Sequence, residues 1–145
     1  MIPRVRVAAL VVLDGRVLLA RHVKEGRTSY LLPGGGMESA ESAAAALRRE
    51  LHEEADVACA VGALRYVVEA RAPDRSRHIV QLVFAAHLLG PVGASRDPRV
   101  AACEWHPIDA LLHLPLHPDA GAAIAADLVA GSTPPRYLDA PWRSY

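Results

Sequence analysis

The sequence GGGMESAESAAAALRRELHEEADV, residues 34–57, is the most informative part of this chain. Three glycines lead into an alanine-rich segment without glycine or proline, and this composition predicts a helix over residues 39–55. At about 100° per residue, Glu50, Glu53 and Glu54 span roughly 100° of that helix surface. The segment therefore carries a compact group of carboxylates directly after a glycine-rich turn.

The three glutamates border the apolar side of the predicted helix. Leu47 and Leu51 lie on the adjoining stripe, which places Glu54 at the edge of the core rather than in water. Carboxylates gathered there repel one another, and burying them is costly. A divalent cation with oxygen ligands would offset this repulsion, so the pattern indicates a metal site. The alternative is an ordinary solvated acidic helix face.

Composition and length narrow the class of protein. With 145 residues, of which 52% are hydrophobic and 22% charged, residues 1–145 are predicted to form one folded domain. The formal net charge is zero, so no basic field suggests binding of nucleic acid. The apolar run at residues 7–13 is too short to span a bilayer, and no signal peptide is visible, so we expect a soluble cytoplasmic protein. Cys59 and Cys103 are expected to be reduced core thiols.

The remaining chain alternates between strand-like and helical segments. Residues 5–13 and 16–22 are rich in valine and leucine and flank Asp14-Gly15, which predicts a β-hairpin with a type I′ turn. Further expected elements are extended segments at 29–32, 57–72, 78–89 and 100–106, and helices at 107–112 and 118–130. We expect the tail, residues 132–145, to be extended and packed on the body, or partly disordered. The order of elements favours a mixed α/β or α+β sandwich.

The spacing of the polar residues within residues 34–57 matches a known signature. Gly35, Glu41, Arg49-Glu50-Leu51, Glu53-Glu54 and Asp56-Val57 stand at the intervals of the Nudix box, so residues 35–57 resemble that motif of the Nudix (MutT-like) hydrolases. One of nine specified positions departs, because Asp56 stands where the family has glycine. A glycine at a helix C-terminus usually adopts the left-handed conformation, which aspartate also tolerates. We therefore expect the departure to remove no catalytic group.

The resemblance implies a fold, an activity and a set of roles. The fold would be the Nudix α/β/α sandwich with a mixed β-sheet, and the activity would be hydrolysis of a diphosphate that needs Mg²⁺, with Mn²⁺ as a substitute. Glu50, Glu53 and Glu54 would be the catalytic metal ligands, one of them serving as general base, and Gly35 would approach the metal through its backbone. Arg49 would pair with Glu41 to fix the loop on the helix; a surface pair between Arg49 and Glu53 is the alternative.

Candidates outside the box are weaker. A further carboxylate could come from Asp97, Glu104 or Glu69, each of which also has a structural interpretation. Arg21 and Arg27 could reach substrate phosphates, and Tyr30 could stack on a base or pack in the core.

Substrate identity is the least determined property. Pro73 stands sixteen residues beyond the box, a placement seen in some ADP-ribose-cleaving Nudix enzymes, although proline is also common in turns. The favoured substrate is a nucleoside diphosphate linked to another group, such as ADP-ribose or another nucleotide sugar. The alternatives are a nucleoside triphosphate pyrophosphohydrolase, a non-catalytic nucleotide sensor with the same fold, and an interaction domain with an acidic helix. By analogy with the family we expect a homodimer.

Overall fold

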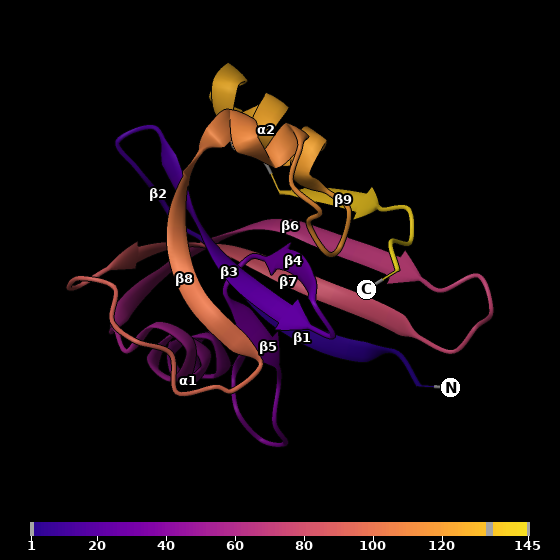
Figure 1. Ribbon diagram of the computed structural model, residues 1–145, viewed down its shortest axis with the longest axis horizontal. Helices are drawn as coiled ribbons and strands as arrows, with labels where there is room; N and C mark the ends of the chain where they lie inside the picture. The colour runs from indigo at the N-terminus through magenta and orange to yellow at the C-terminus, as the bar shows by residue number, and fades with distance from the viewer. Residues whose placement is uncertain (1, 133–134, 145) are drawn as a thin grey trace.

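Two β-sheets lie between helices on opposite sides in the computed structural model, which describes residues 2–132 and 135–144 (Figure 1). Sheet A has the strand order β5-β1-β7-β6-β9 within these residues. Its strands are β1 (Arg4–Leu10), β5 (Gly34–Gly36), β6 (Cys59–Arg71), β7 (His78–Leu88) and β9 (Arg136–Asp139). In sheet B, β3 pairs with each of the other three strands. Its strands are β2 (Val12–Leu13), β3 (Arg16–Lys24), β4 (Arg27–Leu31) and β8 (Val100–Pro107).

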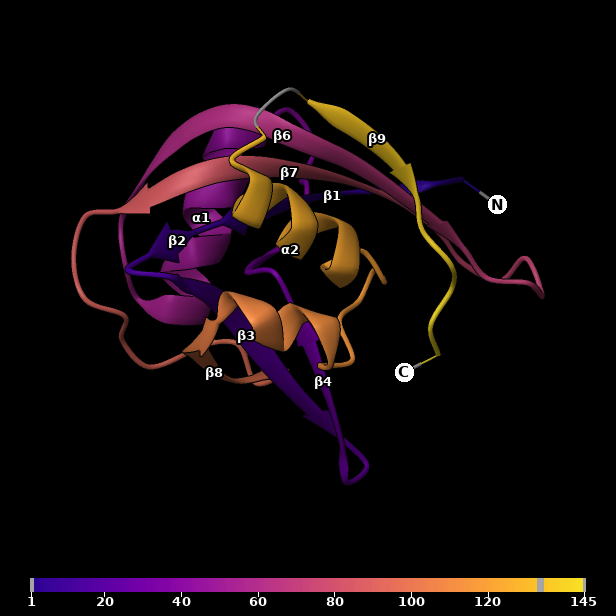
Figure 2. The same ribbon diagram turned by 90° about the horizontal axis from the view of Figure 1, so that it is seen from above.

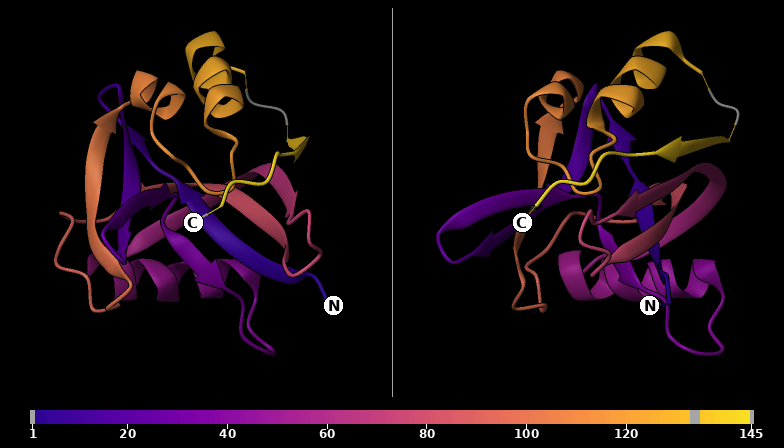
Figure 3. Two further views of the ribbon diagram at one scale, coloured as in Figure 1. Left: turned by 45° about the vertical axis from the view of Figure 1, so that its right-hand side comes forward. Right: turned by 90° about the vertical axis from the view of Figure 1, so that its right-hand side faces the viewer.

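The helices complete a three-layer arrangement. Figure 3 shows α1 (Ala43–Ala55) on one side of the sheets, and α2 (Gly121–Ala130) with the 3₁₀ helix η1 (Ile108–Leu112) on the other. Figure 2, seen from above, shows α2 and η1 lying beside each other over the strands. Sheet A is mixed, because β1 pairs with β7 in parallel and with β5 in antiparallel fashion. The predicted α/β/α sandwich with a mixed sheet is confirmed.

Two hydrophobic clusters fill the space between the layers. The cluster below α2 includes Tyr66, Leu19 and Ile124, none of which is more than 1% exposed. The other cluster joins Leu47 and Leu51 of α1 to the sheets, and both leucines are fully buried. The side of α1 that the sequence pattern assigned to the core is therefore the side that packs.

The first hairpin divides between the two sheets. Asp14 and Gly15 have positive φ of 52° and 72°, as a type I′ turn requires, so the predicted turn is confirmed. Only β2, two residues long, continues this hairpin by pairing with β3. The preceding strand β1 joins sheet A instead, where its residues Val7 to Leu10 are buried on both faces. A continuous apolar run is typical of such a central strand.

Helix α1 begins later than the sequence predicts. Its N-cap is Ser42, whose Oγ accepts a hydrogen bond from Ala45 N at 3.1 Å, whereas we expected the helix to start at residue 39. The prediction was wrong because Ala40 has a φ of 66° and residues 38–41 form a turn. The C-terminal expectation is confirmed, since Asp56 adopts the left-handed conformation with φ 48°.

The C-terminal segments are also trimmed relative to the prediction. Helix α2 starts at Gly121 rather than at residue 118, and Gly131 closes it with φ 68°. In the tail, β9 pairs with β6 in parallel fashion, so this segment is extended and packed on the body. Residues 133, 134 and 145 of the predicted tail lie outside the described residues. No helix in the described part of the chain is long and apolar enough to cross a membrane.

Candidate active site

The glutamates of α1 differ sharply in their exposure. Glu50 and Glu54 are only 5% and 3% exposed, whereas the Glu53 side chain is 43% exposed. This difference follows from the helix period, because Glu50 and Glu54 are one turn apart and share the inward side with Leu47 and Leu51. Two carboxylates therefore enter the protein interior, and the third lies where solvent and a ligand can reach it.

Arg49 ties the glycine turn to the helix. Its guanidinium donates to both carboxylate oxygens of Glu41, at 2.7 and 3.2 Å, and to the carbonyl oxygen of Gly36 at 3.1 Å. The same group reaches Glu50 at 2.9 Å and, more distantly, Glu53 at 3.5 Å. These contacts raise the pKa of Arg49, with the Glu41 hydrogen bond as the largest cause. The expected Arg49–Glu41 pair is present, and the alternative pair with Glu53 is the longest of these contacts.

The glycines of β5 bring the backbone against the carboxylates. A Cβ placed on Gly35 would lie 2.5 Å from Cδ and Oε1 of Glu50, closer than any side chain tolerates. Gly34 N donates to Oε2 of Glu54 at 3.3 Å, and a Cβ on Gly34 would collide with Val7 O at 1.9 Å. Only glycine lets this strand pass between β1 and the acidic side of α1.

The negative charges of the two buried carboxylates are only partly compensated by the described residues. Burial, followed by the nearby charge of Glu50, raises the pKa of Glu54 to about 8. Burial also raises the pKa of Glu50, against the opposing effect of Arg49. Among the described residues, Oε2 of Glu50 is buried with no hydrogen-bond partner. A cation at this position would satisfy that oxygen and favour both ionised carboxylates.

These groups line a cavity of about 300 Å³. Its acidic wall carries Glu50, Glu53 and Glu54, and its other walls bring in groups from β1, β3 and the loop before β8. The lining residues are Arg4, Arg6, His22, Gly34, Gly35, Gly36, Met37, Glu38, Arg49, Glu50, Glu53, Glu54, Asp97 and Arg99. The cavity thus combines carboxylates with cationic side chains, as a metal-bound anion requires.

Asp97 is the candidate from outside the box that lines this cavity. Its side chain is only 9% exposed and is held by Arg99, which donates from Nη2 to Oδ2 at 2.8 Å and from Nε to Oδ1 at 3.1 Å. The hydrogen bond from the Arg99 side chain lowers the pKa of Asp97. Asp97 is thus an ionised carboxylate beside the helix glutamates, already engaged by one cation.

The other candidates lie away from the cavity lining. Arg21 pairs with Glu104 at 2.7 Å on sheet B, and Tyr30 packs edge-to-face on His106 with ring centroids 5.3 Å apart. Arg27 begins β4 at the far end of the β3–β4 hairpin. Glu69 accepts a hydrogen bond from Tyr137 OH at 2.7 Å and also contacts His78, at the β6–β7–β9 end of sheet A.

Sequence reasoning missed Arg4, Arg6, His22 and Arg99, which do line the cavity. The arginines of β1 reach it because β1 pairs with β5, with Arg6 opposite Gly36. Local sequence carries no signal for that pairing. For Arg99 a signal existed, namely its position two residues after Asp97, where a short turn brings the two side chains together.

The side chains around the cavity suit a divalent ion in their chemistry more than in their present arrangement. Among residues 2–132 and 135–144, no three His, Cys, Asp or Glu side chains converge as ready-made ligands of one ion. Arg49 occupies part of the space between Glu50 and Glu53. The residues nevertheless suit a hard divalent ion, because the donors are carboxylates and one buried carboxylate oxygen has no partner.

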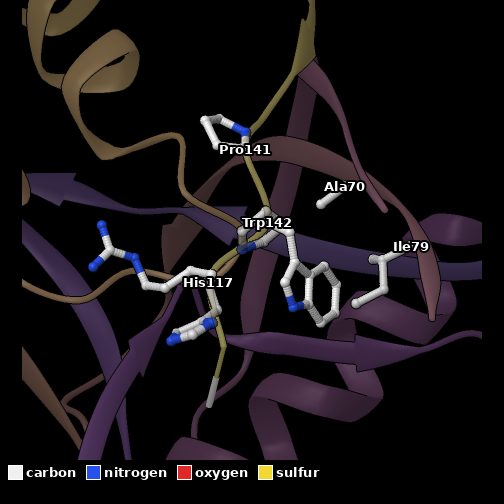
Figure 4. Close-up of a pocket in the computed structure, with 7 residues that line it drawn as sticks. Ala70, Ile79, His117, Pro141 and Trp142 are labelled. Carbon is white, nitrogen blue, oxygen red and sulfur yellow. The ribbon is translucent and has the colours of Figure 1, made fainter. Parts of the chain in front are cut away.

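A second cavity, of about 10 Å³, lies under the C-terminal tail. Figure 4 shows the indole of Trp142 directed toward Ile79, with His117 nearby. The Arg77 guanidinium lies 5.6 Å from the centroid of the Trp142 ring. Burial, followed by the charge of Arg143, lowers the pKa of His117 to about 4. This cavity is large enough for about one water molecule and marks where the tail is anchored.

Comparisons with known proteins identify the family of this chain. A family model described as NUDIX domain matches residues 2–127, so the protein belongs to the Nudix family. An RNA pyrophosphohydrolase of Halorhodospira halophila is 36% identical over 121 residues, which cover 68% of this chain and 65% of that protein. The chain therefore spans somewhat less than two thirds of that relative.

Solved structures share the fold. A MutT NUDIX hydrolase from Burkholderia pseudomallei superimposes with a TM-score of 0.73 and 31% identity, covering 89% of this chain and 99% of that one. A NUDIX hydrolase from Nitrosomonas europaea gives a TM-score of 0.79 at 20% identity, covering 91% and 92% of the two chains. The second similarity concerns the fold alone. The family predicted from residues 35–57 is confirmed.

Proposed function

We propose that this protein hydrolyses the diphosphate linkage of a nucleotide substrate with the help of a divalent cation. The observation that carries the proposal is the pair of buried carboxylates, Glu50 and Glu54, which face a cavity together with the exposed Glu53. Burying two carboxylates is costly unless a cation is bound, so a purely structural role for this arrangement is unfavourable.

The cation would be held by Glu50, Glu53 and Glu54, and Mg²⁺ is the ion we propose, with Mn²⁺ as a substitute. When bound, it would neutralise phosphate charge and acidify a water molecule. Arg49 holds the Glu50 carboxylate toward the cavity and, through Glu41 and Gly36, fixes the glycine strand beside it. Gly35 allows the closest approach of that strand to Glu50. Among these groups, Glu53 is the proposed general base, because it is ionisable and accessible from the cavity.

The proposed substrate is a nucleoside diphosphate linked to another group, with ADP-ribose or another nucleotide sugar as the first choice. A protein from Streptococcus suis named as an ADP-ribose pyrophosphatase shares the fold with a TM-score of 0.72, but at 18% identity. Nucleoside triphosphates are the second choice. The relative named as an RNA pyrophosphohydrolase adds RNA as a third.

The direct experiment is a hydrolysis screen with Mg²⁺ and with Mn²⁺. The panel contains nucleotide sugars, nucleoside triphosphates, dinucleoside polyphosphates and 5′-triphosphorylated RNA, and released phosphates are measured by chromatography. Glu53→Gln should reduce turnover of the best substrate by at least about 100-fold, because it removes both a proposed ligand and a base. Since Glu53 is partly exposed, the Tm of the Glu53→Gln variant should stay within about 2 °C of that of the wild type.

Two outcomes would redirect the proposal. Full turnover by Glu53→Gln would show that the site is misassigned. Tight binding of ADP-ribose in calorimetry, with no turnover of any panel member, would favour a nucleotide sensor. The intact carboxylates argue against a sensor, because binding alone does not require a buried acidic pair. A homodimer stays a prediction by analogy, which light scattering of the purified protein would test.

A further inference from the structure

Arg4 differs from the other arginines around the acidic cavity. Arg49 is paired with Glu41 at 2.7 Å, and Arg99 is paired with Asp97 at 2.8 Å. Arg4 also lines the cavity, yet it makes no ion pair or hydrogen bond with any residue in 2–132 or 135–144. Its guanidinium therefore presents a full set of donors to a ligand.

Gly36 makes room for this guanidinium. A Cβ on Gly36 would lie 2.8 Å from Nη2 of Arg4 and 3.2 Å from its Nε. The missing side chain thus lets Arg4 lie directly on the backbone of β5. Because the obstacle would be the end of a flexible side chain, glycine is needed here for the position of Arg4 rather than for the fold.

The free edge of β5 faces the cavity. Within the described part of the chain, β5 is the edge strand of sheet A and pairs with β1, with Val7 opposite Gly35. Gly34 N donates to Glu54, and Gly36 O accepts from Arg49, so the polar groups of these two glycines point away from β1. In an antiparallel strand, the N–H and C=O of one residue point to the same side. The N–H of Gly36 therefore also points outward.

The carboxylates and Arg4 lie on opposite faces of this edge strand. Side-chain directions alternate along a strand, and that of Gly35 points at Glu50 while that of Gly36 points at Arg4. The two groups contact consecutive residues of the strand, so a ligand at this edge meets one of them on each face. A diphosphate crossing the edge of β5 would place one phosphate beside Glu50 and the other beside Arg4.

We propose that Arg4 and the N–H of Gly36 form the binding site for the substrate phosphate that is not held at the carboxylates. This inference rests on the proposed function, because it concerns the same substrate. The guanidinium supplies charge-assisted hydrogen bonds, and the backbone N–H supplies one fixed donor. Together they would hold the diphosphate across β5 and select diphosphates over monophosphates.

The test compares Arg4→Ala and Arg4→Lys with the control Arg16→Ala, which removes the same charge at the start of β3, outside the cavity lining. Binding of methylenediphosphonate, a non-hydrolysable diphosphate, is measured by calorimetry with Mg²⁺ present. Arg4→Ala should weaken binding about tenfold, Arg4→Lys should weaken it less, and Arg16→Ala should leave it unchanged. For the substrate found in the screen, Arg4→Ala should raise KM by a similar factor with a smaller effect on kcat.

Gly36→Ala supplies an independent variant that keeps the charge. Its methyl group should displace the Arg4 guanidinium and weaken methylenediphosphonate binding by several-fold. The affinity of the double variant Gly36→Ala/Arg4→Ala should lie within about twofold of that of Arg4→Ala alone, because both changes act on the same contact. Equal binding and KM for Arg4→Ala and Arg16→Ala, in a wild-type protein that hydrolyses a diphosphate, would overturn this inference while leaving the proposed function standing. Absence of both binding and turnover in the wild type would overturn the two together.

Discussion

Replacing Gly35 by alanine should disable the acidic site without removing any of its functional groups. The new Cβ would lie 2.5 Å from Cδ and Oε1 of Glu50 and 2.6 Å from Oε2, whereas ordinary contacts begin at 3.4 Å. The carboxylate would therefore have to retreat by about 0.9 Å, the difference between 3.4 and 2.5 Å. Its 2.9 Å contact with Arg49 could not survive unchanged.

The size of the effect follows from overpacking a buried, hydrogen-bonded carboxylate. Overpacking costs about 1–3 kcal/mol, and loss of a hydrogen bond to a charged group costs a similar amount. A net loss of about 2 kcal/mol corresponds to a fall in Tm of about 4–8 °C for a chain of this size. Turnover should fall by at least about 100-fold, because a shift of 1 Å in a catalytic group is costly.

Thermal unfolding followed by circular dichroism, together with the hydrolysis assay, would measure both effects. Gly36→Ala is the matched control for stability, since the three atoms nearest to its Cβ all belong to the flexible end of the Arg4 side chain. Shortening the displaced side chain should restore space, so Gly35→Ala/Glu50→Asp should recover part of the lost Tm. The reasoning would be refuted by a Gly35→Ala variant with wild-type Tm and wild-type turnover.

Two further predictions concern stability away from the carboxylates. Asp56→Gly should raise Tm by about 1–3 °C without raising turnover. Glycine suits the left-handed φ of 48°, and the exposed ion pair of Asp56 with Arg96 contributes little to stability. A drop in Tm would contradict this prediction. Tyr66→Phe should cost about 1–2 kcal/mol in urea unfolding at pH 7, because the buried Tyr66 hydroxyl donates to Asp127 at 2.8 Å. That hydrogen bond, followed by the one from Arg136, lowers the pKa of Asp127. The contribution of ionised Asp127 to the free energy of unfolding is therefore present above about pH 4 and is lost as the pH falls through the lowered pKa. The stability difference between Tyr66→Phe and wild type should therefore shrink below pH 4, and a constant difference would disprove the linkage.

The network around Tyr66 also shows what the C-terminal segment contributes. Asp127 of α2 accepts from Tyr66 of β6 and from Nη1 of Arg136, at 2.7 Å to each of its oxygens. One carboxylate thus joins helix α2 to strand β6 of sheet A and to the added strand β9. This arrangement explains why the tail is extended along β6, which the sequence could indicate only as one of two alternatives.

Errors at element boundaries had local physical causes. The start of α1 was placed too early because residues 39–42 have helix-compatible composition, but Glu41 accepts a hydrogen bond from Glu38 N at 2.7 Å and pairs with Arg49. These contacts hold a turn in place of a first helical turn. A short-range pattern contains no information on Arg49 reaching back over eight residues, although the family motif did imply it.

The amino-acid sequence is sufficient to predict the elements whose signals are local. Helical periodicity placed Glu50, Glu53 and Glu54 beside the buried leucines, the turn residues fixed the hairpin at Asp14, and the motif indicated the family. Each of these follows from spacing along a single element, which the chain carries without reference to the rest of the fold.

The residues from other elements that face the carboxylates can be identified from the folded chain alone. Arg4 enters the cavity because β1 pairs with β5, and Asp97 enters because the loop before β8 passes α1. Arg21 and Tyr30 carry equally suitable chemistry but lie outside the cavity lining, although His22 beside Arg21 on β3 belongs to it. The pairing of distant strands depends on the packing of the entire core, so no local pattern could separate these residues.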